Sequence, residues 1–383
     1  MNFVIFSYNF LPLNDAEAYC TTRFASALSF MGHSVTVVTM DHKSGVSDQV
    51  YHQLIDDKLR IVRLPIIRKE KPLLARIRYF TYEWEAVCFS SCIKKVKEIL
   101  SETEEPILIT RTNPLASSIV GWHCRKFAKK WIAHLSDPIP IPGRDTDWKN
   151  FHKYVNIFWM NRVLRDADIV SVTCPNAVRA FQDMYGSITK NTRFIVTPHI
   201  GDPPLRSVLE KSQTSEEEVK QIVHKGLMCF GRGAENLIDA VAQLNNNGLR
   251  CEYIQCGQVD DVNYLFTNNP FARRLDRCDG DVEYIPDLKV PLPYCPFLSS
   301  KFVYRIYDNK PILLYTNKDS LSAELAMKYP EAGIFFADNS KAGALKETLK
   351  KALSFDPATI DRSRIRQEFT RERIGNDFLS AIK

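Results

Sequence analysis

Short apolar runs rich in β-branched residues alternate along the chain with segments of helical periodicity, and this alternation restricts the fold more than any other feature. The first example is a strand predicted at residues 2–7, a polar loop, a helix that ends at Gly32, and a strand at residues 34–40. A strand, a helix and a strand within about 40 residues form a βαβ unit, which implies a parallel sheet. The loop after the first strand is therefore a candidate site.

The alternation continues through most of the chain. Further strands are predicted at residues 60–67, 106–110, 131–135, 168–173, 194–197, 227–230, 251–256, 281–285 and 312–314. Helices are predicted among others at residues 74–100, 270–277 and 341–353, and a last helix at residues 360–382. A chain of 383 residues is long enough for two domains. Pro203 and Pro204 interrupt the alternation, so we predict domains at residues 1–198 and 226–355, a linker at 199–225 and a C-terminal helix at 356–383.

Two features suggest the cellular compartment. The first residues, MNFVIFSYNFLPL, lack a basic leader, and no apolar stretch is long enough to cross a membrane, so we expect a cytoplasmic protein without a signal peptide. The ten cysteines are then expected to be reduced and buried.

Positive charge is concentrated at residues 58–97, which contain eleven Lys and Arg residues and three Glu residues, together with Tyr79, Phe80, Tyr82 and Trp84. Such a basic and aromatic stretch suits an anionic membrane surface. The alternative interpretation is the solvated face of an ordinary helix.

Residues 296–313, PFLSSKFVYRIYDNKPIL, combine a helix start, a short helix and a buried strand. Ser299 and Ser300 are N-cap candidates, and Lys301 follows them at the start of the helix. A helix N-terminus after a loop favours an anion, because unpaired N–H groups and the helix dipole point toward it. Arg232, in a glycine loop after another predicted strand, is a second candidate for this anion site. The alternative is a capped helix and a surface arginine.

Four polar residues at predicted strand ends are candidates for acid–base chemistry or ligand binding. Asp137 follows the strand at residues 131–135 and is a candidate general base, or else an Asx-turn cap. His134 is a second candidate base, or a core histidine. Asp15 and Glu17, in the first loop, could bind ligand hydroxyls, or Asp15 could cap the following helix.

Two Asp-x-Asp triplets occur, at residues 145–147 and 279–281. Such a pair can chelate a divalent cation on a diphosphate. A three-residue pattern arises easily by chance in a chain with 45 acidic residues, so we expect no metal site.

Several segments appear in an order that is itself informative. They are FVIFSYNFLPLNDAEAYCTTRFASALSFMGHSVTVVT, WIAHLSDP, VLRDADIVSVTCPNAVRAFQDMYG, FIVTPHIGDP, FGRG followed by ENLIDAVAQL, and PFLSSKFVYRIYDNKPIL. Together they resemble the GT-B glycosyltransferases, especially the family-four members, in which the last segment commonly reads P-S-K-L-F-E-Y-L-A-A-G-K-P-V-I.

The resemblance implies an α/β protein of GT-B fold, with two Rossmann-like doubly wound parallel-sheet domains facing a central cleft. Residues 1–198 would bind the acceptor, residues 226–355 would bind a nucleotide-sugar donor, and residues 356–383 would cross back toward the N-terminal domain. The implied activity is transfer of a sugar from a nucleotide-diphosphate donor to a saccharide or lipid-linked saccharide in cell-envelope polysaccharide synthesis. The implied reaction needs no metal ion and no cofactor, and it retains the configuration of the sugar. The enzyme would be cytoplasmic, peripheral on the inner face of the membrane, and would not bind nucleic acid. The implied site residues are Asp137 and His134 for catalysis, Arg232, Ser299, Ser300, Lys301 and Tyr304 for the donor, and Asp15 and Glu17 for the acceptor.

The sequence also departs from the family. Tyr304 stands where a glutamate commonly holds the donor ribose, and Pro296 stands where another glutamate faces the sugar. Two alternatives therefore stay open. One is a catalytically degenerate homologue that acts as a scaffold or regulatory subunit, and the other is a nucleotide-sugar epimerase of the same architecture.

Overall fold

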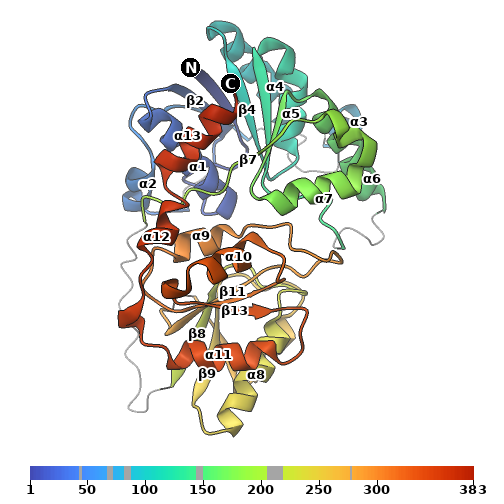
Figure 1. Cartoon of the computed structure of the whole chain (residues 1–383). Helices are drawn as coiled ribbons and strands as arrows, with labels where there is room; N and C mark the ends of the chain where they lie inside the picture. The colour runs from blue at the N-terminus through green and yellow to red at the C-terminus, as the bar shows by residue number, and fades with distance from the viewer. Residues whose placement is uncertain (43–44, 67–71, 82–87, 144–149, 205–218, 277) are drawn as a thin grey trace. The chain divides into compact units, whose positions relative to one another are not determined.

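The computed structural model of the chain describes residues 1–42, 45–66, 72–81, 88–143, 150–204, 219–276 and 278–383. The chain divides into two compact units (Figure 1). The first unit consists of Met1–Leu205 and Phe369–Lys383, and the second unit consists of Arg206–Glu368. The C-terminal residues therefore fold with the N-terminal part of the chain.

The first unit is built on a seven-stranded parallel sheet with the order β3-β2-β1-β4-β5-β6-β7. Its strands are β1 (Asn2–Phe6), β2 (Ser34–Met40), β3 (Arg60–Leu64), β4 (Ile107–Thr112), β5 (Lys130–Leu135), β6 (Ile169–Val172) and β7 (Phe194–Val196). All residues of β4 and β6 are buried. Because successive side chains of a strand point to opposite faces, both faces of the sheet are covered there.

The helices of the first unit follow the strands in the predicted alternation. They are α1 (Ala16–Phe30), α2 (Asp48–Leu54), α3 (Pro72–Tyr79), α4 (Phe89–Glu102), α5 (Ala116–Cys124), α6 (Asn150–Asp166), α7 (Pro175–Tyr185) and the C-terminal α13 (Arg371–Ala381). α13 packs against α1, where the rings of Phe24 and Phe378 lie 5.0 Å apart. The long helix predicted at residues 74–100 is wrong, since α3 ends at Tyr79 and α4 starts at Phe89.

The second unit contains a six-stranded parallel sheet with the order β10-β9-β8-β11-β12-β13. Its strands are β8 (Lys220–Lys225), β9 (Cys251–Cys256), β10 (Ala272–Leu275), β11 (Val282–Pro286), β12 (Ile312–Thr316) and β13 (Ile334–Asp338). Its helices are α8 (Ala234–Asn246), α9 (Ser300–Arg305), α10 (Leu321–Lys328), α11 (Ala344–Ser354) and α12 (Ser363–Gln367). α8 and α11 pack together over one core, which includes Leu237, Tyr253 and Leu349.

The first strand of the second unit differs from the prediction. The strand predicted at residues 227–230 is wrong: these residues form a loop after β8, with one isolated bridge between Met228 and Val259. β8 instead comprises the last six residues of the segment predicted as a linker. Its charged end is stabilised by the sheet, because Lys225 Nζ lies 2.7 Å from Glu283 Oε1 of β11. The earlier linker residues 205–218 lie outside the described residues.

Other elements also differ from the prediction. The helix predicted at residues 270–277 is wrong, because β10 lies there as an edge strand and Arg273 Nη2 pairs with Glu252 Oε1 of β9 at 2.7 Å. Charged residues are common on edge strands, but they weaken the strand signal in the sequence. The last predicted helix is broken: α12 ends at Gln367, and Thr370 caps α13 by accepting a hydrogen bond from Arg373 N.

The order of strands places one reversal point in each sheet. In the first unit the chain moves from β1 to one side through β2 and then returns to the other side at β4. In the second unit β8 is flanked by β9 and β11 in the same way. In such sheets ligands bind beyond the carboxyl ends of the strands at the reversal point. None of the helices in the described segments has the length and apolar character needed to cross a bilayer.

Candidate functional site

In the first unit, Asp15 caps α1 just beyond the carboxyl end of β1. Its Oδ1 accepts a hydrogen bond from Ala18 N at 2.8 Å, and its Oδ2 accepts one from Asn9 Nδ2 at 3.2 Å. The N-cap alternative is therefore confirmed. Acceptor binding by Asp15 stays a prediction.

Glu17 is the second residue of α1 and is buried, with 8% of its surface exposed. Arg111 Nε, at the end of β4, lies 3.2 Å from Glu17 Oε1, and Ser136 Oγ, just after β5, donates to Glu17 Oε2 at 2.7 Å. Burial raises the pKa of Glu17 from 4.5 to about 7; Arg111 and Ser136 lower it, and the charges of Asp137 and Asp15 raise it. Glu17 can thus gain or lose a proton near neutral pH.

Asp137 follows Ser136 directly, so it lies beyond the carboxyl end of β5, next to the strand that carries Arg111. It is half-buried and lines a cavity of about 150 Å³ together with Asn113 and Asn156. This position suits a group that must meet a hydroxyl from solvent. Its catalytic role stays a prediction.

His134 is 2% exposed and lies inside the sheet. Its Nδ1 is 3.0 Å from Ser171 Oγ of β6, and among the described residues its Nε2 has no hydrogen-bond partner. Burial, with contributions from Arg111 and His199, lowers the pKa of His134 well below 6.5. The imidazole is therefore neutral at pH 7, and its proposed role as a base would require access that the buried side chain does not have in this structure.

The structure thus brings Glu17 and Asp137 together and adds Arg111, which sequence analysis did not identify. Arg111 is paired in register with His134 on the adjacent strand and is buried. An arginine at the end of the apolar run ILITRT was the available signal. Charged residues are seldom buried without a partner, so such a position points to a paired carboxylate nearby.

In the second unit, Lys301 and Arg232 lie at the carboxyl ends of β8 and β11. Lys301 is the second residue of α9, and its side chain passes over Gly226, where an added Cβ would lie 2.2 Å from Lys301 Cε. An added Cβ would force the Lys301 side chain to move, and the φ of +132° at Gly226 also favours glycine. Burial lowers the pKa of Lys301 from 10.5 to about 8; Arg232 lowers it further, and Asp287 raises it.

Arg232 belongs to the loop that leads into α8, between two glycines with positive φ. Its Nη1 donates to the carbonyl of Pro286 at the end of β11 at 3.3 Å, and among the described residues its buried Nε has no hydrogen-bond partner. Asp287, the next residue, is buried, and burial raises its pKa while Arg232 and Lys301 lower it. Two cations therefore act on one buried carboxyl group, an arrangement that favours an added anion.

His224 of β8 reports the same positive environment. It is fully buried, and its Nδ1 lies 2.8 Å from the carbonyl of Tyr284. Burial, followed by the charge of Lys301, lowers its pKa to about 3. Sequence analysis identified neither His224 nor Asp287.

The remaining donor candidates lie on or beside α9. Ser299 occupies the N-cap position, but its side chain makes no capping hydrogen bond, and Ser300 is the first residue of the helix. Both are half-buried, as is Tyr304, whereas Pro296 is buried. Donor binding by Ser299, Ser300 and Tyr304 stays a prediction.

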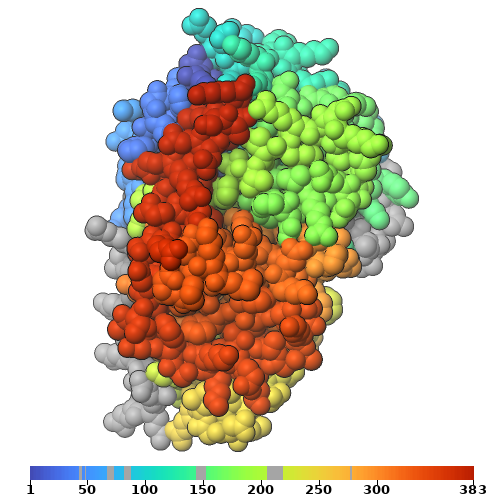
Figure 2. Space-filling model, in the orientation of Figure 1, coloured from blue at the N-terminus to red at the C-terminus, as the bar shows by residue number. Residues whose placement is uncertain are grey.

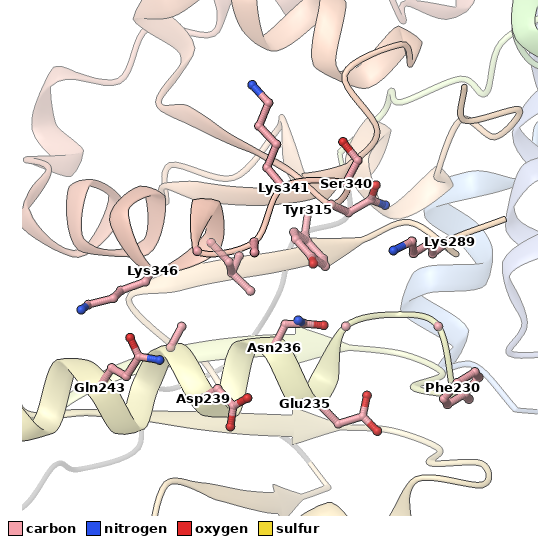
Figure 3. A pocket seen from close by; sticks show the side chains of 17 residues that line it. Phe230, Glu235, Asn236, Asp239, Gln243, Lys289, Tyr315, Ser340, Lys341 and Lys346 are labelled. Atoms are coloured by element: carbon pink, nitrogen blue, oxygen red, sulfur yellow. The ribbon is translucent and has the colours of Figure 1, made fainter. Parts of the chain in front are cut away.

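A cavity of about 580 Å³ adjoins the glycine loop. Gly231 and Gly233, on either side of Arg232, line it together with Asp239 of α8. Figure 3 shows Asn236 projecting from α8 toward Tyr315, which lies on the opposite side of the cavity. Polar side chains beside two aromatic rings, those of Phe230 and Tyr315, suit a polar ring-shaped ligand such as a nucleoside or a sugar.

The Asp-x-Asp triplet at residues 279–281 is engaged in the protein itself. Asp279 pairs with Lys310 and lies 3.6 Å from Lys225, and Asp281 Oδ2 accepts a hydrogen bond from Gln221 N at 2.7 Å. The triplet at residues 145–147 lies outside the described residues. Within the described segments no group of three or more His, Cys, Asp or Glu residues is placed to hold a metal ion. All ten cysteines are free, and their predicted burial is confirmed.

Comparison with known proteins identifies the fold. No protein-family model and no curated protein sequence matches the chain. Solved structures do match over nearly the whole length. Sucrose-phosphate synthase from Thermosynechococcus elongatus matches with a TM-score of 0.65 and 16% identity, and covers 99% of this chain and 98% of its own. Anabaena HepE, solved in complex with UDP and glucose, matches with a TM-score of 0.65 and 15% identity, and covers 100% of this chain and 99% of its own.

The chain has the GT-B fold. WaaG, a glycosyltransferase involved in lipopolysaccharide biosynthesis, is also similar, with a TM-score of 0.57, 13% identity and coverage of 99% and 98%. The GT-B fold predicted from the sequence is thereby confirmed, as two parallel sheets of seven and six strands.

Proposed function

We propose that the chain is a glycosyltransferase that moves a sugar from a nucleotide-diphosphate donor to a saccharide or lipid-linked saccharide acceptor in cell-envelope polysaccharide synthesis. The observation that carries the proposal is the pair of cations, Lys301 and Arg232, at the reversal point of the second sheet. The similar HepE structure, solved with UDP and glucose, supports a sugar nucleotide as the ligand. The enzyme would act in the cytoplasm.

The second unit would stabilise the leaving group. As the bond between the sugar C1 and the diphosphate oxygen breaks, negative charge develops on the diphosphate. The ammonium group of Lys301 and the guanidinium group of Arg232 would hold that charge without a metal ion. Arg232 Nε, which is buried and has no hydrogen-bond partner among the described residues, is one donor that a phosphate oxygen would satisfy.

The first unit would supply the acceptor side. The acceptor oxygen forms the new bond to C1 and loses its proton, for which the Asp137 carboxylate is the proposed base. Glu17, linked to the adjacent Ser136 by a 2.7 Å hydrogen bond, would position the start of the Asp137 loop. We propose retention of configuration at C1 on the basis of the family-four resemblance.

Binding of the donor provides the direct test. The purified chain is titrated calorimetrically with UDP-, GDP- and dTDP-sugars, and we expect saturable binding of at least one. Lys301→Ala and Arg232→Ala should each weaken that binding by about tenfold or more, since each removes a charge-assisted hydrogen bond. Lys350→Ala, at an exposed position of α11, is the matched control. Absence of binding to every sugar nucleotide would refute the proposal.

A specific observation favours a second candidate, a non-catalytic homologue that serves as a scaffold or regulatory subunit. Tyr304 and the buried Pro296 occupy the positions where the resemblance leads us to expect glutamates. This candidate predicts that Asp137→Asn leaves the cellular glycan unchanged, whereas a transferase predicts a lost or truncated glycan. An epimerase would instead release nucleotide and an altered sugar without an acceptor, which product analysis would reveal.

A further inference from the structure

Helix α3 of the first unit exposes an unusual number of large apolar side chains. Leu73, Leu74 and Ile77 are 68%, 62% and 68% exposed. They are spaced at i, i+1 and i+4, so they share one face of a two-turn helix, and the exposed Arg78 lies beside them. Single exposed apolar residues are normal, but three on one short helix form a patch that calls for a partner.

The opposite face of α3 fixes the helix to the protein. Ala75 and Tyr79 are buried, one turn apart. The Tyr79 hydroxyl lies 2.9 Å from Ser90 Oγ of α4, and Trp159 Nε1 of α6 donates to the Tyr79 carbonyl at 3.0 Å. Figure 1 shows α3 beside α6 accordingly. The apolar patch therefore belongs to an anchored helix whose inner face is already occupied.

Positive charge surrounds the same region. His123, whose ring lies 5.6 Å from that of Tyr79, has a pKa lowered to about 4 by burial and then by the charges of Lys97, Arg125 and Arg78. Lys97 also lies over the ring of Phe127, a further exposed apolar residue. Of the basic and aromatic stretch predicted at residues 58–97, Tyr82 and Trp84 lie outside the described residues.

We propose that α3 docks the protein on an anionic lipid bilayer, with Leu73, Leu74 and Ile77 inserted among the head groups and Arg78 on the lipid phosphates. The combination of an apolar face and flanking cations is the one that interfacial helices use. A stable protein–protein contact buries about 800 Å² and 20 or more residues on each side, far more than this patch offers. Docking of this kind would place a transferase next to a lipid-linked acceptor, but it does not require sugar transfer.

Vesicle co-sedimentation tests the proposal with the full chain. The probes are vesicles of phosphatidylcholine alone and of phosphatidylcholine mixed with phosphatidylglycerol. We expect binding to the mixed vesicles that weakens in high salt. Replacing Leu73, Leu74 and Ile77 together by Ser should weaken it by about tenfold or more, since each side chain loses its burial in lipid. Met327→Ser, which removes a 62% exposed apolar side chain from the second unit, should leave binding unchanged.

The same experiment distinguishes lipid docking from unfolding of α3 and from self-association of the chain. Arg78→Gln should weaken binding to the mixed vesicles while leaving tryptophan fluorescence unchanged, which shows that α3 is still docked beside Trp159. Three results would overturn the proposal: no vesicle binding by the unmodified chain, equal binding by the triple variant, or a self-associated chain that the triple variant converts to a monomer. If the unmodified chain binds a sugar nucleotide but no vesicles, docking alone is refuted. If it binds the mixed vesicles but no sugar nucleotide, the transferase alone is refuted.

Discussion

Replacing Glu17 by Gln should remove most of the pH dependence that this buried carboxyl group imparts to the first unit. The substitution preserves the volume of the side chain and its hydrogen bond from Ser136 Oγ, but it cannot ionise. In the folded chain burial raises the pKa of Glu17 from 4.5 to about 7, against the lowering effect of Arg111. The folded protein therefore holds a proton at pH values where the unfolded chain has lost it.

The magnitude follows from linkage. Between pH 4.5 and about 7 the unfolded state binds fewer protons at this residue, so stability falls as pH rises, by about 1.4 kcal/mol per pH unit. The whole effect is about 3 kcal/mol, is absent below pH 4.5 and is complete above pH 7. Glu17 is 8% exposed, so solvent screening reduces this value little.

The position of the tryptophans makes the assay specific to the first unit. All five, Trp84, Trp122, Trp131, Trp148 and Trp159, lie before residue 206, so tryptophan fluorescence follows the unfolding of the first unit alone. Urea unfolding of the unmodified chain and of Glu17→Gln is measured from pH 4 to pH 8. The unmodified chain should lose about 3 kcal/mol of unfolding free energy relative to Glu17→Gln as the pH rises over this range.

Glu102→Gln is the control, because Glu102 is exposed and lies on α4 of the same unit. The free energy of unfolding of Glu102→Gln should change with pH in the same way as that of the unmodified chain. Parallel curves for Glu17→Gln as well would show that Glu17 titrates as an ordinary carboxyl group and would refute the account of the buried cluster.

Two further predictions concern the anion site and the C-terminal helix. Burial and Arg232 lower the pKa of Lys301 to about 8, so the affinity for a nucleoside diphosphate should fall by up to about tenfold per pH unit above pH 8. The affinity of the Lys301→Arg variant should stay constant up to about pH 10. Calorimetric titration measures both, and identical pH profiles would contradict the assignment. Thr370→Ala should remove the N-cap of α13 and lower the free energy of unfolding of the first unit by about 1 kcal/mol. Tryptophan fluorescence in urea checks this, and an unchanged midpoint would show that the cap contributes nothing.

Strands that are buried on both faces, such as β4 and β12, could be predicted from the sequence because their apolar runs are unbroken. β8 and β10 were not predicted from the sequence, because their charged residues form ion pairs with neighbouring strands, Lys225 with Glu283 and Arg273 with Glu252. Such pairs depend on strand order, which local sequence does not contain.

The site residues likewise differ in whether a local sequence signal marks them. Lys301 and Arg232 were predictable, because a helix start and a glycine loop are local signals. Arg111 and Asp287 were not predicted, because each interacts with a residue that is distant in the sequence. Arg111 pairs with Glu17, and the charge of Lys301 lowers the pKa of Asp287. Glu17 was predicted to bind the acceptor, but its burial and its raised pKa could be seen only in the structure.

The central claim is that the carboxyl ends of β8 and β11 hold the diphosphate of a sugar nucleotide. A crystal structure of the chain with the nucleoside diphosphate that it binds most tightly tests this claim most directly. The account predicts diphosphate oxygens within hydrogen-bond distance of Lys301 Nζ and of the Arg232 guanidinium group. A diphosphate bound elsewhere with both side chains unengaged, or a site that stays without nucleotide at saturating concentration, would contradict it.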